Sequence, residues 1–157
     1  MTPNSRTYAL IAAAGSLALL LGAFGFQHLG GLAPCKMCLW QRWPHAVAVL
    51  IGALVLFVPL RILYLLGALA AATTGGIGVY HTGVERGWWK GPDTCTSGDI
   101  SGLSTDDLLD QIMTAPIVRC DEVAWEMFGL SMASWNALAA FAFAALWLIA
   151  WRASSAE

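Results

Sequence analysis

Four stretches of the chain carry no charged residue and are long enough to cross a lipid bilayer. They cover residues 7–35, 43–60, 62–84 and 127–151. A membrane helix needs roughly 20 apolar residues, because about 30 Å of hydrocarbon is crossed at about 1.5 Å per residue. Within these stretches the sequence predicts spans over residues 8–27, 44–59, 62–81 and 134–151. The expected fold is an all-α integral membrane four-helix bundle, built as a single four-span domain over residues 1–157.

Two other interpretations of the apolar stretches are less consistent with the residues. A soluble helical bundle would show a polar stripe along each helix, and residues 46–57 show none. A cleaved signal peptide would have an apolar core of roughly 7–15 residues and small residues at its cleavage site. The first apolar stretch is longer than such a core, and the residues that flank the predicted helix, Phe26-Gln27-His28, are not small. We therefore expect this helix to be retained as a span.

Composition and charge support a membrane protein whose polar residues are concentrated in one segment. Hydrophobic residues make up 58% of the chain and charged residues 11%, whereas soluble domains carry about 25% charged residues. The net charge of −2 provides no basic patch for nucleic acid. Nine of the ten acidic residues lie between Glu85 and Glu126. This distribution predicts an aqueous loop over residues 82–133, with a second loop over residues 28–43.

All four cysteines fall in these two loops. Cys35 and Cys38 lie in the first, and Cys95 and Cys120 lie in the second. With four crossings, both termini share one side of the bilayer and both loops share the other. Four cysteines on one face suggest two pairs in an oxidising compartment, which in bacteria is the periplasm. Lysine and arginine counts do not determine the orientation, so the cytoplasmic placement of the termini depends on the cysteines.

The first pair forms a Cys-x-x-Cys motif, Pro34-Cys35-Lys36-Met37-Cys38. This spacing lets two sulfurs meet and is typical of redox-active thiols. Half of a zinc site has the same spacing, but structural zinc takes four ligands, and the other two cysteines form no second such motif. Arg42, four residues after Cys38, can stabilise a thiolate or bind a carbonyl oxygen, or it can extend to the headgroups.

The second loop contains two further features. The residues around Cys95 are rich in turn-forming types, so we expect Cys95 to be exposed and mobile. Residues 104–115 predict a short amphipathic helix, with Ser104 as its cap and an apolar face that includes Leu108 and Ile112. That face can lie on the bilayer surface or pack on the spans. The loop between Cys95 and Cys120 is long enough for Cys120 to reach the first pair.

In these features the chain resembles the DsbB family of disulfide bond formation proteins. The resemblance covers residues 10–151 and rests on motifs in both loops and at the start of the last span. They are Pro-Cys-x-x-Cys-x-x-x-Arg at 34–42, the cysteine pair of the second loop, Arg119-Cys120-Asp121, Trp125, Phe128-Gly129-Leu130-Ser131-Met132 and Trp135-Asn136. The resemblance implies a bacterial inner-membrane thiol:quinone oxidoreductase that supports disulfide bond formation.

The resemblance also implies a role for each cysteine. Cys95 is attacked by a periplasmic thioredoxin-like oxidase of the DsbA type, and Cys120 then pairs transiently with Cys35. Cys38 remains as a thiolate against a quinone, and Arg42 assists quinone reduction. The quinone is ubiquinone or menaquinone, and no metal or flavin is expected.

Two further residues match family positions near the quinone. His81 corresponds to a histidine that can donate a hydrogen bond to a quinone oxygen, and Met132 corresponds to a residue of the quinone pocket. Glu85, one turn after His81, can influence that histidine. Gln41 stands where some relatives have an acid and receives no role, and His45 is expected to be structural.

Three other functions fit parts of the pattern. The first is a vitamin K epoxide reductase-like enzyme, which has the same four-helix layout but reduces a small-molecule epoxide. The second is a metal-binding membrane protein, and the third is a structural membrane protein with two static disulfides. Three measurements distinguish these functions from the family function. They are the quinol yield with a thioredoxin-like protein as electron donor, the metal content of the purified protein, and the effect of Cys38→Ser on activity.

Overall fold

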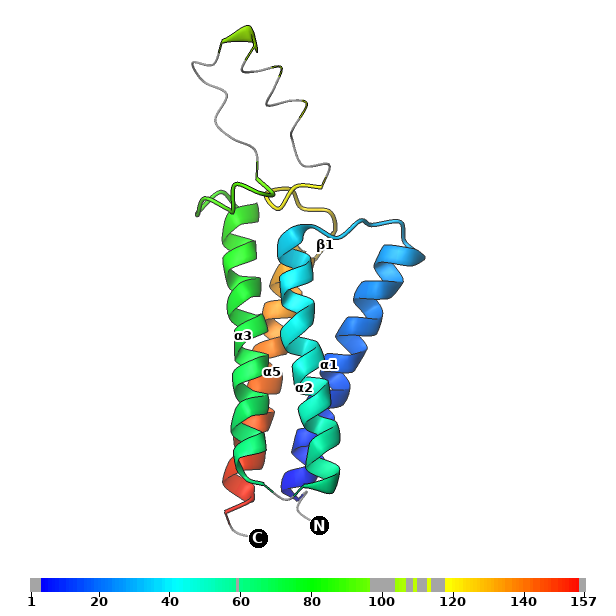
Figure 1. Cartoon of the computed structure of the whole chain (residues 1–157), viewed down its shortest axis with the longest axis vertical. Coiled ribbons are helices and arrows are strands. Elements are labelled where there is room, and N and C mark those ends of the chain that lie inside the picture. The colour runs from blue at the N-terminus through cyan, green and yellow to red at the C-terminus, as the bar shows by residue number, and fades with distance from the viewer. Residues whose placement is uncertain are drawn as a thin grey trace.

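The computed structural model is a bundle of four long helices, as the sequence predicts (Figure 1). It also contains a small hairpin that was not predicted from the sequence. It describes residues 4–58, 60–96, 104–106, 109, 113 and 118–155. The helices are α1 (Ser5–His28), α2 (Lys36–Phe57), α3 (Ile62–Glu85) and α5 (Met132–Ala153). Each has 22 or 24 residues and is long and apolar enough to cross a membrane. The predicted helix at 104–115 falls mostly outside the described residues.

Both described ends of the chain lie at one end of the bundle, and the cysteine-bearing segments lie at the other (Figure 1). Helix α1 packs against α2 and α5, and α3 packs against the same two helices. Helices α1 and α3 therefore occupy opposite positions, with α2 and α5 between them. This arrangement agrees with the even number of crossings.

Helix α2 begins earlier than expected. The predicted span starts at Pro44, but the helix begins at Lys36 and contains Pro44 in its interior. The Cys35 side chain caps it by accepting the Cys38 backbone N–H, so eight residues assigned to a loop are helical. Membrane helices tolerate an internal proline because neighbouring groups can satisfy the freed carbonyl. Cys38, Gln41 and Arg42 therefore project from a helix and not from a loop.

A short hairpin connects the second loop to α5. Strands β1 (Glu126–Met127) and β2 (Leu130–Ser131) pair in antiparallel fashion. The two turn residues, Phe128 and Gly129, both have positive φ, as a tight two-residue hairpin requires. Ser131 then caps α5 by accepting the Ser134 backbone N–H. The hairpin thus fixes where Met132 and Asn136 enter the bundle.

Small residues let the helices approach closely in the core. Buried alanines of all four helices pack with Ile51, Val55, Tyr64 and Trp147. A Cβ atom added at Gly67 would lie 2.5 Å from the Trp147 ring, and the Trp147 side chain is completely buried. In a bilayer such close packing replaces the hydrophobic effect as the force between helices. Gly67 and Trp147 therefore define the contact between α3 and α5.

We expect Gly67→Ala to lower the thermal stability of the detergent-solubilised protein, because overpacking a core costs about 1–3 kcal/mol. Gly76→Ala on the same helix is the matched control, since nothing lies within 4 Å of its added Cβ. Its stability should be unchanged or slightly higher, because alanine favours helix. Equal melting temperatures for the two variants would contradict this account of the α3–α5 contact.

Candidate functional site

The four cysteines form one cluster at the end of the bundle. Cys95 and Cys120 are joined by a disulfide with a Cα–Cα distance of 5.3 Å. This disulfide packs with Cys35, Met37 and Val84, and the partly buried Cys38 lies against the same group. The structure therefore brings together two pairs that are far apart in the sequence.

The expectation that Cys95 is exposed is wrong, because only 1% of its surface is accessible. The Cys120 backbone N–H donates to the Cys95 carbonyl at 2.6 Å, and Lys36 Nζ donates to Thr94 Oγ1 at 3.1 Å. These bonds hold the turn-rich segment onto the start of α2. The turn residues predicted the local conformation, but they could not indicate that the turn packs on the bundle.

Cys35 and Cys38 are free thiols whose sulfur atoms lie 2.6 Å apart. Cys35 immediately precedes α2, and its sulfur accepts the Cys38 backbone N–H at 3.1 Å. The hydrogen bond with the Cys38 side chain, together with burial, raises the pKa of the Cys35 thiol above its usual range. The backbone N–H groups of Cys38 and Met37 act in the opposite direction but do not outweigh these effects. The Cys35 thiol is therefore harder to deprotonate than a solvent-exposed cysteine.

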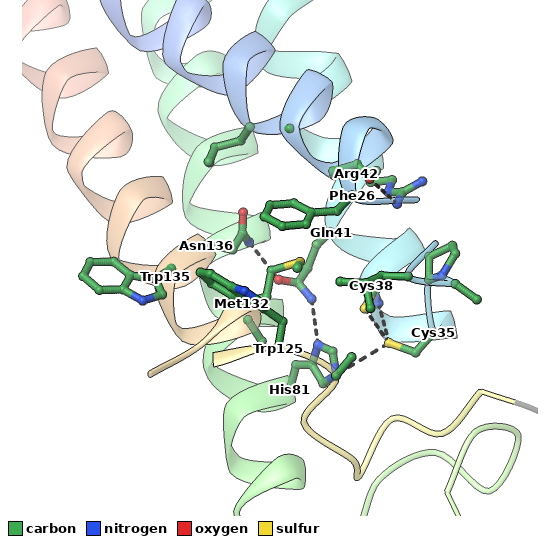
Figure 2. Close-up of a pocket in the computed structure, with 18 of the residues that line it drawn as sticks. Phe26, Cys35, Cys38, Gln41, Arg42, His81, Trp125, Met132, Trp135 and Asn136 are labelled. Atoms are coloured by element: carbon green, nitrogen blue, oxygen red, sulfur yellow. Dashed lines mark hydrogen bonds between the residues drawn. The ribbon is translucent and has the colours of Figure 1, made fainter. Parts of the chain in front are cut away.

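A pocket of about 330 Å³ lies beside this pair, at the end of the bundle that carries the cysteines (Figure 2). Its wall is mostly apolar and includes Ala18, Leu19, Ala23 and Phe26 of α1. Trp125, which stacks at an angle on Phe26 with ring centroids 5.5 Å apart, closes one side. The volume lies at the lower end of the range of small-molecule sites, about 300–1,000 Å³. Such a pocket suits the flat head of an apolar molecule.

Arg42 lies in the pocket wall and is held by α1. Its guanidinium donates to Gln27 Oε1 at 2.6 Å and to the Ala23 carbonyl at 3.3 Å. The same group lies 4.8 Å from the centroid of the Phe24 ring, and it remains within electrostatic reach of Cys38. Gln27 has no role among the predictions made from the sequence. An uncharged polar residue in an otherwise apolar span is the signal that identifies it.

His81 and Met132, the other predicted pocket residues, also line this cavity. His81 Nε2 lies 3.6 Å from Cys35 Sγ and 3.8 Å from Glu85 Oε1. The other Glu85 carboxylate oxygen accepts a short hydrogen bond from the Ser131 hydroxyl. Met132 is the first residue of α5, next to the hairpin. The pocket thus contains all three residues for which the sequence predicted quinone contact.

Two amide side chains that the sequence analysis left without a role connect these residues. Gln41 Nε2 lies 3.0 Å from His81 Nδ1, and Asn136 Nδ2 donates to Gln41 Oε1 at 2.8 Å (Figure 2). Both residues line the pocket. Polar side chains within spans commonly mark functional sites, and the position of Asn136 in a charge-free stretch could have drawn attention to it. Gln41 lies in the predicted loop, so the same signal does not apply to it.

Cys35, Cys38 and His81 are also the described residues that could hold a metal ion. Two thiolates on one zinc ion would lie about 3.8 Å apart, given a Zn–S distance of about 2.3 Å and tetrahedral geometry. The observed 2.6 Å between the sulfurs is much shorter. This geometry suits a pair that exchanges between dithiol and disulfide better than it suits a zinc site.

Comparisons with known proteins agree with this site. The family model "Disulfide bond formation protein DsbB" matches residues 5–150. A Pseudomonas aeruginosa protein named disulfide bond formation protein B 2 is 33% identical, and the alignment covers 94% of this chain and 90% of that protein. A disulfide bond formation protein B of Pasteurella multocida is 35% identical over 76% of this chain and 71% of its own length. No solved structure matches the chain.

The pKa of Cys35 gives a test of the thiol pair. In a protein with Cys95 and Cys120 replaced by serine, Cys38→Ala removes the main cause that raises this pKa. The pKa should fall, so alkylation of Cys35 by iodoacetamide should begin at lower pH than when Cys38 is present. Mass spectrometry of the Cys35 peptide across a pH series measures this shift.

Leu39→Ala in the same background is the matched control, because Leu39 is exposed and makes no contribution to the pKa of Cys35. Its alkylation profile should follow that of the background protein. Alkylation of Cys35 at an unchanged or higher pH in Cys38→Ala would contradict the conclusion that Cys38 raises the pKa of Cys35.

Proposed function

Because this chain belongs to the DsbB family of disulfide bond formation proteins, we propose that it transfers electrons from a DsbA-type thioredoxin-like protein to a membrane quinone. Family membership and the four spans establish a multi-pass membrane protein of disulfide formation. The proposal of a route to quinone depends mainly on one observation. Two cysteine pairs pack in a single cluster, and one of their members, Cys38, forms part of the wall of an apolar pocket.

The proposed route begins at the Cys95–Cys120 disulfide. A thiolate of the partner attacks Cys95 Sγ, so a new partner–Cys95 bond forms while the Cys95–Cys120 bond breaks. Cys120 leaves as a thiolate, and it already packs in the same cluster as Cys35. Because Cys95 is buried, the partner has to displace part of the loop before the sulfur becomes accessible. The second partner thiol then attacks its own mixed disulfide and completes oxidation of the partner.

The second step transfers the electron pair to the Cys-x-x-Cys motif. When Cys35 and Cys38 are oxidised, Cys120 attacks Cys35 Sγ and Cys38 leaves as a thiolate. Cys95, which the oxidised partner has released as a thiolate, then attacks Cys120 Sγ. This restores the Cys95–Cys120 disulfide and releases Cys35 as the second reduced sulfur of the pair. Cys35 sits at the capping position of α2 and is buried in the cluster with the loop pair, whereas Cys38 lies one turn into the helix and is only partly buried. Both line the pocket, so we assign the exchange with Cys120 to Cys35 and the contact with the acceptor to Cys38.

The residues of the pocket fit a quinone head. A bound quinone supplies a two-electron, two-proton acceptor for the reduced pair. Arg42 can hold one ring oxygen by a charge-assisted hydrogen bond, and His81 can donate to an oxygen from another side. Phe26, Trp125 and Met132 supply apolar surface for the ring. The choice between ubiquinone and menaquinone depends on the headgroup and is left to experiment.

The proposed location is the bacterial inner membrane. Both ends of the chain would then lie in the cytoplasm and the cysteine cluster in the periplasm, where a DsbA-type partner operates. The arrangement in Figure 1, with termini and cysteines at opposite ends of the bundle, supports this orientation.

Quinol formation tests the proposed route directly. The purified protein is mixed with a reduced DsbA-type partner and a soluble ubiquinone analogue, and the quinone absorbance is followed. Wild type should turn over, whereas Cys38→Ser and Cys95→Ser should each reduce the rate by at least about a hundredfold, because either change interrupts the route. Cys95→Ser should also fail to form a covalent complex with the partner.

A conservative change outside the route, Ser155→Ala, provides the control and should retain wild-type turnover. Full quinol formation in either cysteine variant would refute the assigned route. Turnover with an epoxide but not with quinone would instead favour the reductase-like alternative.

Arg42→Met should raise the KM for quinone about ten- to a hundredfold, because a charge-assisted hydrogen bond contributes roughly 1.5–3 kcal/mol. Formation of the covalent complex between Cys95 and the partner should be unaffected. Arg61→Met is the matched control, since Arg61 lies over Trp151 near the other end of the bundle. A comparable rise in KM in both variants would show that Arg42 acts only through general stability.

A further inference from the structure

A chain of hydrogen bonds crosses the wall of the pocket and joins two histidines through two amides. From His81 it passes to Gln41 at 3.0 Å and then to Asn136 at 2.8 Å (Figure 2). From Asn136 it continues to His45 Nε2 at 2.8 Å. Gln41, His45, His81 and Thr74, which contacts Asn136, are all buried. In such surroundings each donor has to face an acceptor. The direction of every bond in the chain can therefore be worked out from its fixed members.

The backbone carbonyl of Met37 fixes the direction of the first hydrogen bond, between Gln41 and His81. It lies 3.1 Å from the amide of Gln41, and a carbonyl oxygen can only accept, so the Gln41 atom there is the amide nitrogen. The same nitrogen lies 3.0 Å from His81 Nδ1. Its second hydrogen points to that ring nitrogen, which must therefore be the unprotonated one. A neutral His81 then carries its hydrogen on Nε2.

The backbone carbonyl of Gln41 fixes the second direction independently. It accepts the Thr74 hydroxyl at 2.9 Å, so the oxygen of Thr74 is left to accept from Asn136 Nδ2 at 3.3 Å. The same Nδ2 donates to Gln41 Oε1, in agreement with the first direction. Asn136 Oδ1 then faces His45 Nε2, which has to donate. His45 Nδ1 is left as a buried acceptor without a partner among the described residues.

The atoms around His81 Nε2 are hydrogen-bond acceptors, as expected if this nitrogen carries the hydrogen. Cys35 Sγ lies 3.6 Å away and Glu85 Oε1 lies 3.8 Å away, and the ring also interacts with the backbone of Cys120. The second oxygen of Glu85 is occupied by the Ser131 hydroxyl, which leaves Oε1 facing the ring. A cysteine sulfur and a carboxylate oxygen can both accept a hydrogen bond.

We infer that Gln41 is a positioning residue that fixes His81 as a hydrogen-bond donor toward the redox cysteines and the pocket, with Asn136 and Thr74 holding Gln41 in the required orientation. The assignment of the donor depends only on the hydrogen-bond partners. Its consequence for the acceptor rests on the proposed function, since a quinone oxygen also needs a donor. The same assignment disfavours a metal ion on His81, because a metal-bound Nε2 needs its lone pair and Nδ1 would then have to donate toward Gln41 Nε2, which is itself a donor.

The histidine tautomers test the inference without any assay of activity. The full-length protein is labelled with ¹⁵N-histidine, reduced at Cys35 and Cys38, and studied by NMR in nanodiscs, with single histidine variants used for assignment. His81 and His45 should both show a protonated Nε2 and an unprotonated Nδ1. His28, which is exposed, should show the mixture typical of a solvated ring. A hydrogen on Nδ1 of His81 in the wild type would overturn the inference.

Two variants of similar size separate polarity from shape. Gln41→Glu replaces the donor with an oxygen that accepts, so the His81 hydrogen should move to Nδ1 while His45 remains unchanged. Gln41→Met removes the polar group, and the His81 tautomer preference should be lost. An unaltered His81 spectrum in both folded variants would overturn the inference. The wild-type spectrum keeps the test valid if a variant does not fold.

Steady-state kinetics then links the tautomer to the acceptor. Gln41→Met should raise the KM for the ubiquinone analogue roughly three- to tenfold, as expected for loss of one hydrogen-bond donor, with the rate of partner trapping unchanged. A wild-type Nε2–H tautomer combined with an unchanged KM would retain the inference about Gln41 but refute contact between His81 and quinone. Absence of quinol formation in the wild type would refute the proposed function alone.

Discussion

The packing of the Cys95–Cys120 disulfide onto the start of α2 is the contact on which the rest of the site depends. It places a covalent loop closure beside Cys35, and it holds the segment after α3 over the end of the bundle. Without this contact the two cysteine pairs would belong to separate parts of the chain. The apolar character of the cluster provides the driving force, because buried cysteine, methionine and valine side chains leave water together.

The bundle combines close helix contacts with one region that stays open. Alanine and glycine allow α3 and α5 to meet around Trp147, and Gly52 meets Ala13 between α2 and α1. Near the cysteines, the larger residues Phe26, Arg42 and Trp125 surround a cavity in place of a close contact. The same fold therefore supplies rigidity at the end with the termini and space for a ligand at the end with the cysteines.

The sequence predicted the class of fold and the gathering of the four cysteines at one end of the bundle, because charge-free length and the position of cysteines are properties that a single chain displays directly. It placed Arg42, His81 and Met132 near one another only through the family resemblance. It could not predict that Cys35 caps α2, that Cys95 is buried, or that Gln27 holds Arg42. Those features depend on contacts between segments distant in sequence, and the polar residues involved have no periodic pattern that would reveal their partners.

The burial of Cys95 has a consequence for chemical selectivity. A disulfide is reduced only by a thiolate that can approach along its S–S axis, and small soluble thiols cannot bind the loop and reshape it. Only a reductant with a matching protein surface gains enough binding energy to open the way. Under the proposed function, this burial keeps small free thiols from reducing the Cys95–Cys120 disulfide and restricts its reduction to the partner protein.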